Sequence, residues 1–559
     1  MSLLQIANGR VIDPKHGVDE EPRDVWIRDG LVVDPPADPA VRADRVIDAA
    51  GCVIMPGGVD IHSHIAGSKV NASRIYRPEE RRAEDGNARS ATDGFRGGTS
   101  GSCPSTESTA LKYIGLGYTT ANDAAIAPSG ARLAHLELTD MPLIDKSFLV
   151  LMGNHRHVLE TIARDEPSQL EVFVNWLLRS TRAIGVKVVN PAGVEHWKQG
   201  YGNLSDLDQA NAELGITPRQ TLLALAQAVD SLGVPHPIHV HGLNLGQPGN
   251  AATTLDTFHA LDGHRAHFAH IQFHSYDGDP NEPGKMISGV ERLAEWVNVH
   301  SDVTLDVGQV LFGSTTSMTG DGPTGEFLAR LSGRKWISHD VELETGCGIL
   351  PIVYSDKNRV HALQWSIGLE WFLRVDDPWQ VALSTDHPNG ASFQAYPELM
   401  ALLMDRGLRR DTIGRLPESV RETTALRDLD REYTLMEIAT ITRAAPARML
   451  GLTHKGHLGP GADGDVTVYR GDDDLRRMFA MPRYVVKAGH VVLDDTQPRL
   501  RIDGKTHVVD LAEPPDSELT SVRDWFDKCA TTRFANFPVP DEMVPDARAV
   551  GPAAKRLPR

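Results

Sequence analysis

Two pairs of histidines, each separated by one residue, are the first feature of this sequence that could do chemistry. His62 and His64 follow one apolar run, and His239 and His241 follow another. Side chains two residues apart on a strand point the same way, so both imidazoles of a pair can reach one metal ion. A lone pair of this kind is often incidental, so its weight depends on what the other strands carry.

Other predicted strands also end in residues that bind metals. His270 ends the apolar run 266–269, with His267 and His274 close by, and Asp386 follows the run that begins at Val381. The chain holds 23 histidines, so some must fall at strand ends by chance. Chance is nevertheless a poor account of ligand-type residues at half of the predicted strand ends. The pattern therefore predicts one shared metal site.

A lysine lies within a further apolar run. Lys187 occupies the middle of residues 185–189. Burying an unpaired ammonium is costly, so burial lowers the pKa of a lysine and favours its neutral amine. That amine can add carbon dioxide and become a carbamate, which is a carboxylate able to bridge two divalent ions. The alternative is a lysine whose amine reaches solvent at the rim.

The strands that would position these residues alternate with longer helical patterns. Residues 217, 218 and 220 (Thr, Pro and Gln) form a capping signal for the helix that leads into the fifth strand. We expect strands at 53–61, 118–125, 148–152, 185–189, 237–240, 266–272, 303–307 and 381–385. This set predicts an α/β fold, a (β/α)8 TIM-type barrel whose active site lies at the carboxyl ends of its strands.

Both ends of the chain differ from the middle. Short strands separated by turns, such as 3–6, 24–27 and 45–48, come before the barrel, and similar strands return after about residue 455. We therefore assign 1–55 and 451–510 to two parts of one small β domain, and 56–450 to the barrel with inserted loops. Residues 511–559 are rich in proline and are expected to form an extended tail that contacts a partner.

Composition excludes several classes of protein. The net charge is −18, with 75 acidic against 57 basic residues, which disfavours binding to nucleic acid or to anionic membranes. No run approaches the roughly 20 apolar residues of a membrane span. The four cysteines are isolated and no signal peptide is apparent, so we expect a cytoplasmic protein.

The order H-x-H, lysine, histidine, histidine, aspartate resembles the amidohydrolase superfamily, in the subtype with a carbamylated lysine and two metals. Segments 8–14 and 455–465 support this resemblance. Segments 56–67, 239–246 and 270–276 resemble, more narrowly, the family of the A subunit of formylmethanofuran dehydrogenase, to which the A subunit of the methylotroph formyltransferase/hydrolase complex belongs. Arginine outnumbers lysine and alanine is abundant, which favours the bacterial complex.

The resemblance implies two zinc ions bridged by carbamylated Lys187. It implies as metal ligands His62, His64, Lys187, His239, His270 and Asp386. His239 and His241 share one face of a strand, so either could be the ligand. The implied reaction is hydrolysis of the formamide of a furan-type C1 carrier, formyl-methanofuran or methylofuran, to formate and the free amine in formaldehyde oxidation. Asp386 would take the proton of the metal-bound water and pass it to the leaving amine.

Basic residues after His64 are candidates for binding the carrier, because carriers of this family bear glutamate chains. Lys69, Arg74 and Arg77 lie in this loop, and Asn244 is a further candidate for substrate binding. A solvated loop neutralised by its own acidic residues is an equal alternative. The implied partners are the small-molecule carrier and the other subunits of a formyltransferase/hydrolase complex.

Three other functions would use the same ligands. One is that of the A subunit of a formylmethanofuran dehydrogenase, condensing formate with the amine in carbon dioxide reduction. Another is a cyclic amidase like hydantoinase or dihydroorotase, from which only the flanking motifs distinguish this chain. The third is a catalytically silent scaffold, which would not need to keep the whole ligand set. A redox role for the chain alone is disfavoured, because it lacks a cysteine cluster and a dinucleotide-binding motif in the right context.

Overall fold

Eight parallel strands form the centre of the computed structural model, which describes residues 2–73, 105–333, 337–340, 346–495 and 497–553. The last and first strands are joined by a parallel bridge between His387 and Ser63, and the His64 N–H donates to the His387 carbonyl at 2.8 Å. In pairing order the strands are β8(Gly58–Ser63), β9(Tyr118–Ile126), β10(Asp145–Leu151), β11(Gly185–Val189), β12(Ile238–His241), β13(Ala266–Phe268), β16(Val303–Asp306) and β20(Val381–Ala382). The predicted α/β barrel is confirmed.

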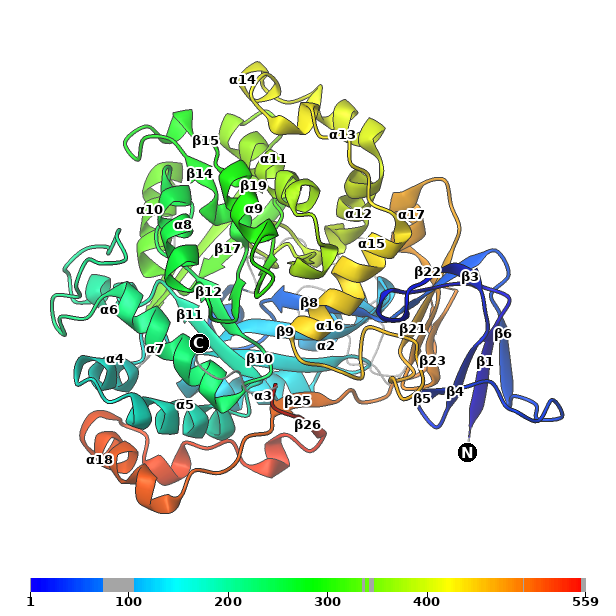
Figure 1. Ribbon diagram of the computed structural model, residues 1–559, viewed down its shortest axis with the longest axis horizontal. Coiled ribbons are helices and arrows are strands. Elements are labelled where there is room, and N and C mark those ends of the chain that lie inside the picture. The colour runs from blue at the N-terminus through cyan, green and yellow to red at the C-terminus, as the bar shows by residue number, and fades with distance from the viewer. Residues whose placement is uncertain (1, 74–104, 334–336, 341–345, 496, 554–559) are drawn as a thin grey trace.

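Helices surround these strands (Figure 1). They include α2(Thr106–Gly115), α3(Ala131–Thr139), α4(Arg156–Ala163), α5(Pro167–Thr181), α6(Gly193–Lys198), α7(Pro218–Leu232), α8(Asn250–Ala260), α9(Val290–Asn298), α11(Arg359–Arg374), α12(Tyr396–Met404), α13(Arg406–Ile413), α14(Glu418–Arg421), α15(Leu435–Ala439) and α16(Ala445–Met449). α7 begins with the predicted capping box. The Gln220 N–H donates to Thr217 Oγ1 at 3.2 Å, and the Thr217 N–H donates to Gln220 Oε1 at 2.9 Å.

Of the eight predicted strands, only 185–189 has the same bounds in the structure, and three of the differences concern the site or the sheet topology. The first predicted strand is divided into β7(Cys52–Pro56), which belongs to another sheet, and β8, and the chain changes sheet at Gly57. A Cβ at Gly57 would lie 2.2 Å from Thr119 Oγ1, so only glycine allows this close approach. β13 and β20 are shorter than predicted: they end at Phe268 and Ala382, before His270 and Asp386, which both have positive φ angles.

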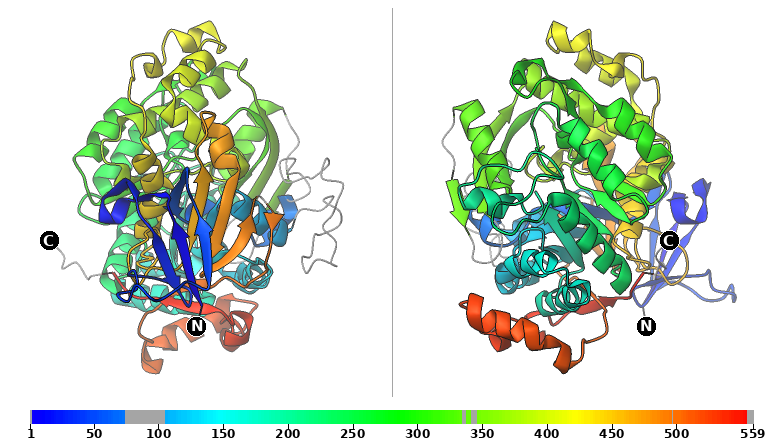
Figure 2. Two further views of the ribbon diagram at one scale, coloured as in Figure 1. Left: turned by 90° about the vertical axis from the view of Figure 1, so that its right-hand side faces the viewer. Right: turned by 60° about the vertical axis from the view of Figure 1, so that its left-hand side comes forward.

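Strands from both chain ends build the small β domain. One sheet has the order β5(Leu31–Val33), β4(Val25–Arg28), β1(Leu3–Ala7), β6(Arg45–Asp48). The other has the order β24(Gln497–Pro498), β23(His490–Asp494), β22(Pro482–Lys487), β21(Val466–Arg470), β7, β2(Arg10–Asp13), β3(Val18–Pro22). Ile6 and Val11 pack in one apolar core with Val466 and Val468. Figure 2 shows these blue and orange strands side by side, as predicted.

Two buried lysines connect this β domain to the barrel. Lys455 Nζ lies 2.6 Å from Asp465 and 2.7 Å from Asp463, and it also contacts Asp145 at the start of β10. Lys487 Nζ lies 2.8 Å from Asp145 and 2.7 Å from Asp465. Each ammonium is thus shared between carboxylates of the two parts, which satisfies charges that would be costly to bury alone.

A second layer lies over the carboxyl ends of the barrel strands, inserted between β16 and β20. It consists of the antiparallel sheet β17(Gly313–Thr319), β19(Gly346–Tyr354) and β18(Ile337–Asp340) with the helix α10(Gly322–Ser332). The short helix α1(Ser68–Ser73), which follows β8, contacts this sheet, and Val70 packs in one cluster with Met318 and Ile349. The hairpin of β14(Tyr276–Asp277) and β15(Ile287–Ser288) comes just before α9 in the sequence.

The segment predicted as an extended tail folds onto the barrel. It contains α18(Thr520–Cys529) and β26(Ala547–Val550), and β26 pairs with β25(Thr506–Val509), which pairs with β10. Aromatic rings hold it in place: Trp176 of α5 stacks on Phe534 and Phe537, with ring centroids 5.0 and 5.5 Å apart. Figure 1 shows α18 below α5. Contact of this segment with a partner stays a prediction.

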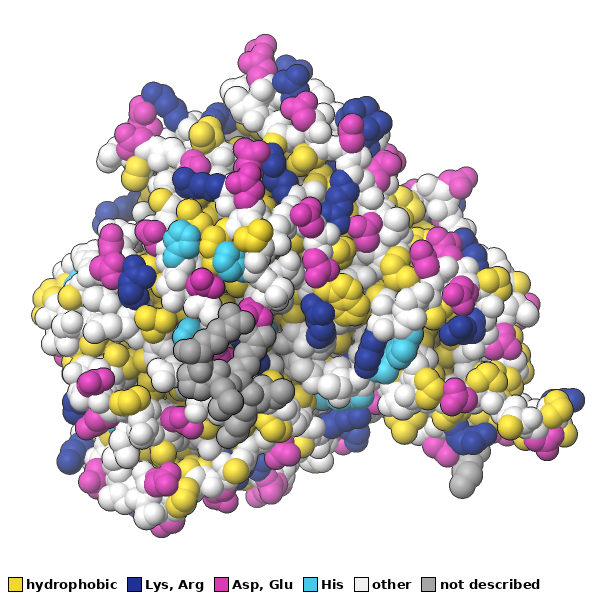
Figure 3. All heavy atoms as spheres, viewed as in Figure 1, with side chains coloured by type: hydrophobic (Ala, Val, Ile, Leu, Met, Phe, Trp, Pro, Cys, Tyr) yellow, Lys and Arg dark blue, Asp and Glu magenta, His cyan; other side chains and the backbone are white. Residues whose placement is uncertain are grey.

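The outer surface is polar and mixed in charge. On the face shown in Figure 3, acidic and basic side chains are interspersed, with apolar side chains between them. In the part of the chain that the structure describes, no helix has the length and apolar character needed to cross a membrane. The short helix α17(Leu475–Ala480) packs on α12.

Candidate metal centre

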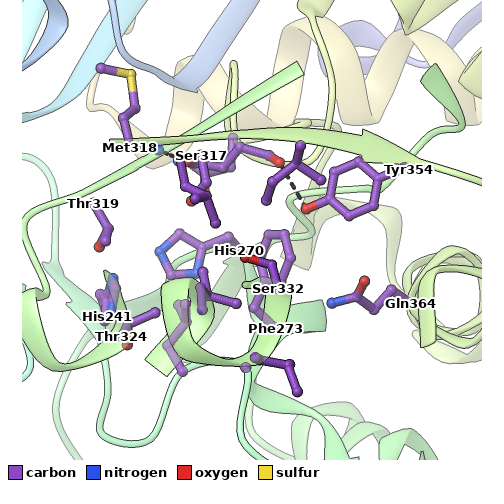
Figure 4. Close-up of a pocket in the computed structure, with 18 of the residues that line it drawn as sticks. His241, His270, Phe273, Ser317, Met318, Thr319, Thr324, Ser332, Tyr354 and Gln364 are labelled. Atoms are coloured by element: carbon purple, nitrogen blue, oxygen red, sulfur yellow. Dashed lines mark hydrogen bonds between the residues drawn. The ribbon is translucent and has the colours of Figure 1, made fainter. Parts of the chain in front are cut away.

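A cavity of about 570 Å³ opens at the carboxyl ends of the barrel strands. Its polar floor contains His62, His64, Lys187, His241, His270 and Asp386. Its walls are largely apolar and come from the inserted layer and the loops beside it, including Phe273, Met286, Met318, Leu328, Leu350, Ile352 and Tyr354. Figure 4 shows His270 between the β17–β19 strands and Phe273, with His241 and Tyr354 on opposite sides. The structure thus brings most of the predicted ligands into one pocket.

The Asp386 carboxylate lies close to both histidines of the first pair. Its Oδ1 lies 3.1 Å from Nε2 of His62 and 3.1 Å from Nε2 of His64. Burial of Asp386 favours the neutral acid, but the charges of His62 and His270 outweigh it and hold the pKa of this carboxyl well below its usual range. Asp386 is therefore an ionised carboxylate among imidazoles, which is a combination that divalent metals bind.

Lys187 lies at the bottom of the same cavity and is 1% exposed. Burial lowers its pKa to about 7, although the nearby carboxylates of Asp306 and Asp386 oppose the shift. Among the described residues, its Nζ has no hydrogen-bond partner, and neither has Nδ1 of buried His270. Buried polar atoms are seldom left without partners. These two atoms, together with the imidazole and carboxylate donors around them, fit a site for divalent metal ions.

The backbone at two predicted ligands is strained. His270 has φ of 34° and Asp386 has φ of 51°, both in the left-handed region that residues other than glycine rarely adopt. Such strain tends to occur at functional sites, where the surrounding structure enforces it. Gly308 makes room for it, because a Cβ at Gly308 would lie 2.4 Å from the Cβ of His270.

The two histidines of β12 lie at different depths. His241 lines the cavity, its ring centroid is 4.8 Å from that of His270, and its Nε2 lies 3.3 Å from Asp321 Oδ2. His239 is not among the described residues that line the cavity. It pairs in register with Lys187, one level deeper in the barrel. The sequence leaves the choice between these histidines open, and the geometry favours His241 as the ligand.

His239 instead contacts other buried histidines. Its Nδ1 lies 2.9 Å from Nε2 of His236, and its Nε2 lies 3.3 Å from Nδ1 of His62. Burial lowers the pKa of His236 and of His239 well below the usual value, so both imidazoles are neutral. His62, His239 and Asp306 form a second group with ligand atoms close together; His62 lines the cavity, whereas His239 and Asp306 are not among the described lining residues.

Asp306, at the end of β16, was not predicted as a site residue. Its Oδ2 accepts from His62 Nδ1 at 2.8 Å and from His267 Nε2 at 3.1 Å. Its Oδ1 accepts from Ser384 Oγ at 2.6 Å and from the N–H of His270 at 3.0 Å. A carboxylate at the carboxyl end of the seventh predicted strand is the signal that could have identified it.

The predicted substrate-binding residues have different outcomes. Lys69 lines the cavity. Arg74 and Arg77 lie outside the described residues. The Asn244 amide donates to the Ser205 carbonyl at 2.8 Å and to Thr253 Oγ1 at 3.2 Å, so it holds its own loop together and is not among the described lining residues.

The fold and the site define an amidohydrolase. The sequence profile described as the amidohydrolase family matches residues 45–493, and this chain belongs to that family. The resemblance predicted from the sequence motifs is therefore confirmed.

Two relatives match over nearly their whole length. Protein FwdA of Methanocaldococcus jannaschii is 40% identical over 98% of this chain and 98% of its own. The A subunit of the formyltransferase/hydrolase complex Fhc of Methylorubrum extorquens is 39% identical over 97% of this chain and 98% of its own. The crystal structure of that organism's FhcABCD complex with methylofuran contains a chain with a TM-score of 0.91 and 37% identity, covering 99% of this chain and 100% of that one.

A dihydroorotase, which is a cyclic amidase, matches this chain over a short segment. The dihydroorotase of Syntrophotalea carbinolica is 46% identical over 65 residues, which are 12% of this chain and 15% of that protein.

Proposed function

We propose that this chain hydrolyses the formamide of an N-formylated, furan-type C1 carrier to formate and the free amine, as the A subunit of a formyltransferase/hydrolase complex. The observation that carries the proposal is the Asp386 carboxylate, 3.1 Å from both His62 and His64 on the floor of a largely apolar cavity. Near full-length similarity to the A subunit of Fhc, and the methylofuran in the crystal structure of that complex, support the choice of carrier.

Two zinc ions are the proposed cofactors, and Lys187, once carbamylated, would supply a carboxylate ligand for them. The proposed ligands are His62, His64, Lys187, His241, His270 and Asp386, with His241 in the place first given to His239. Imidazole nitrogens and carboxylate oxygens are donors that suit zinc. When bound, such ions acidify a coordinated water and polarise a carbonyl oxygen.

The chain's own residues handle the proton and the substrate. Asp386 accepts a proton at its carboxylate from the attacking water and delivers it to the leaving amine nitrogen. It is suited to the first step because its lowered pKa keeps it ionised. The apolar walls around Phe273 and Tyr354 exclude water and accommodate the furan ring, and the Lys69 ammonium attracts the acidic chain of the carrier.

The reverse reaction, condensation of formate with the amine, would use the same residues. The 40% identity to FwdA leaves this direction as the second candidate. Proton transfer by Asp386 then runs from the amine to the departing water.

The test measures formate released from formylated carrier by the purified protein with the subunits that copurify with it. Asp386→Asn is expected to reduce the rate by about 10²–10⁴-fold, the usual contribution of a general acid–base. Asp376→Asn, which changes an exposed carboxylate, is the matched control. Undiminished formate release by Asp386→Asn would contradict the mechanism, and turnover of dihydroorotate or a hydantoin in place of the carrier would favour a cyclic amidase.

A further inference from the structure

A column of polar side chains runs from His62, on the cavity floor, down the interior of the barrel. His62, His236, His239, His267 and Asp306 are all 0% exposed. The interior of a TIM barrel is normally filled by layers of bulky apolar side chains. Burying five groups that can carry charge is costly unless each is hydrogen-bonded. Their contacts therefore decide what they contribute.

One end of the column is fixed by the backbone. His236 Nδ1 lies 2.8 Å from the carbonyl oxygen of Met449, at the end of α16. A carbonyl can only accept, so this nitrogen carries the proton. A neutral imidazole has one N–H and one lone pair, so His236 Nε2 must be an acceptor. The proton in its 2.9 Å contact with His239 therefore lies on His239 Nδ1.

The protonation of His239 in turn affects its neighbour His62 at the proposed metal site. Because His239 Nδ1 carries the proton of that ring, His239 Nε2 presents a lone pair. This lone pair lies 3.3 Å from Nδ1 of His62. Two lone pairs would repel each other, so the arrangement favours a proton on His62 Nδ1.

Asp306 imposes the same state on His62 from another side. Its Oδ2 lies 2.8 Å from His62 Nδ1 and acts as an acceptor for the N–H. His267 Nε2 donates to the same oxygen at 3.1 Å, and His267 Nδ1 is held by Thr304 Oγ1 at 2.9 Å. With its Nδ1–H donated to Asp306, His62 turns its Nε2 toward Asp386 Oδ1, 3.1 Å away, and toward the cavity. A metal ion bound there would take the place of a proton shared by that nitrogen and the carboxylate.

We propose that His236, His239 and Asp306 are positioning residues that keep a proton on Nδ1 of His62 and thereby turn its Nε2 toward a metal ion in the cavity. The inference rests on the proposed metal-dependent function. It gives His239 a structural role toward His62 and explains why a histidine lies one level below the cavity. Partners of this kind, which hydrogen-bond to metal-binding histidines, commonly affect metal affinity by about 10–100-fold.

His236 is the best place to test the inference, because it lies two contacts away from His62. His236→Leu removes both hydrogen bonds, whereas His236→Gln can still donate to the Met449 carbonyl and accept from His239. His135→Leu is the matched control, since His135 is also buried and donates to a carbonyl, that of Thr181, at 2.9 Å. Zinc affinity is measured by competition with a chelator on the full-length protein.

We expect His236→Leu to weaken zinc binding by about 10-fold or more, His236→Gln to recover most of it, and His135→Leu to leave it unchanged. In parallel, nitrogen-15 NMR of histidine-labelled, metal-free protein should show a protonated Nδ1 in His62, assigned by the signal lost in His62→Gln. The His62 tautomer should become mixed in His236→Leu. A merely structural role for His236 would lower stability in both Leu variants without moving this signal.

The outcomes separate this inference from the proposed function. If wild-type protein binds zinc and hydrolyses the carrier, but His236→Leu keeps the same zinc affinity and His62 tautomer, the positioning role is wrong and the function stands. If wild-type protein binds no metal, the proposed function fails, and the NMR signal of His62 still decides the tautomer. A His62 ring without a proton on Nδ1 in metal-free wild-type protein would overturn the inference directly.

Discussion

Asp386 Oδ1 lies 3.1 Å from Nε2 of His64, although 322 residues separate the two in the sequence. The contact joins the end of the last barrel strand to the end of the first. His62 reaches the same oxygen at the same distance. One carboxylate oxygen thus contacts both histidines of the first pair.

Metal uptake is expected to depend on carbon dioxide. Burial lowers the pKa of Lys187 to about 7, so near neutral pH a large share of the amine is neutral and can react. Metal-free protein given zinc with bicarbonate should therefore recover its metal content and activity, and recovery should be faster above pH 7 than below it. Recovery in carbon-dioxide-free buffer should be much slower. Equal recovery in both buffers would argue against a carbamate, and Lys187→Ala should not respond to bicarbonate.

Lys187 should also make the stability of the metal-free protein depend on pH. The unfolded chain keeps this amine protonated up to about pH 10.5, whereas the folded chain releases its proton near pH 7. Between these values the unfolded state binds more protons, so the unfolding free energy rises with pH, by at most about 1.4 kcal/mol per pH unit. Lys187→Met should lack this rise in urea unfolding without carbon dioxide, and Lys505→Met, at an exposed lysine, should keep it. The same pH slope in Lys187→Met and wild type would refute the expectation.

Gly308→Ala is expected to disturb the metal site from a distance. Gly308 has φ of +66°, and an added Cβ would lie 2.4 Å from the His270 Cβ, so His270 must move. Gly333→Ala is the matched control, because Gly333 has φ of +63° with nothing within 4 Å of the added Cβ. Both variants should lose about 1–2 kcal/mol of stability through the backbone. Only Gly308→Ala should lose zinc content by elemental analysis, and equal content in the two would contradict the prediction.

Lys455→Met should destabilise the junction between the β domain and the barrel. Removal of this ammonium leaves Asp145, Asp463 and Asp465 buried with too little positive charge. Breaking a buried ion pair by removing one partner typically costs about 3–5 kcal/mol. Lys505→Met removes an exposed ion pair with Asp546 and should cost less than about 1 kcal/mol. Urea denaturation at neutral pH compares the two, and similar costs would show that the buried network adds little.

Much of the barrel can be predicted from the sequence, because each buried parallel strand is a short apolar run followed by a polar residue. The bounds are less predictable where the backbone does something special. Gly57 marks a change of sheet that hydrophobicity alone cannot reveal, since residues on both sides are buried. β13 and β20 end before His270 and Asp386. The positive φ angles of these two residues depend on tertiary contacts, which the sequence does not reveal. The folding of residues 511–553 onto α5 depends on aromatic contacts between distant segments.

The candidate site is predictable in part for similar reasons. Residues at strand ends have a regular position in the sequence, so the cavity residues His62, His64, Lys187, His270 and Asp386 can be identified from it as candidate ligands. The sequence does not show how deep in the barrel a strand residue lies. It therefore cannot distinguish His239 from His241, which share one face of β12. Asp321 contacts His241 from the inserted layer, where no regular spacing relates it to the barrel strands.

The bridge between Ser63 and His387, which closes the barrel, lies between residues proposed to bind the ions. Asp386 on one side of this join and His62 and His64 on the other would be fastened together by any ion they share. Bound ions would then reinforce the backbone contacts that close the barrel, and loss of the ions would weaken this join. Hydrogen exchange in metal-free protein should accordingly be fastest, within the barrel sheet, at the His64 amide that spans the join.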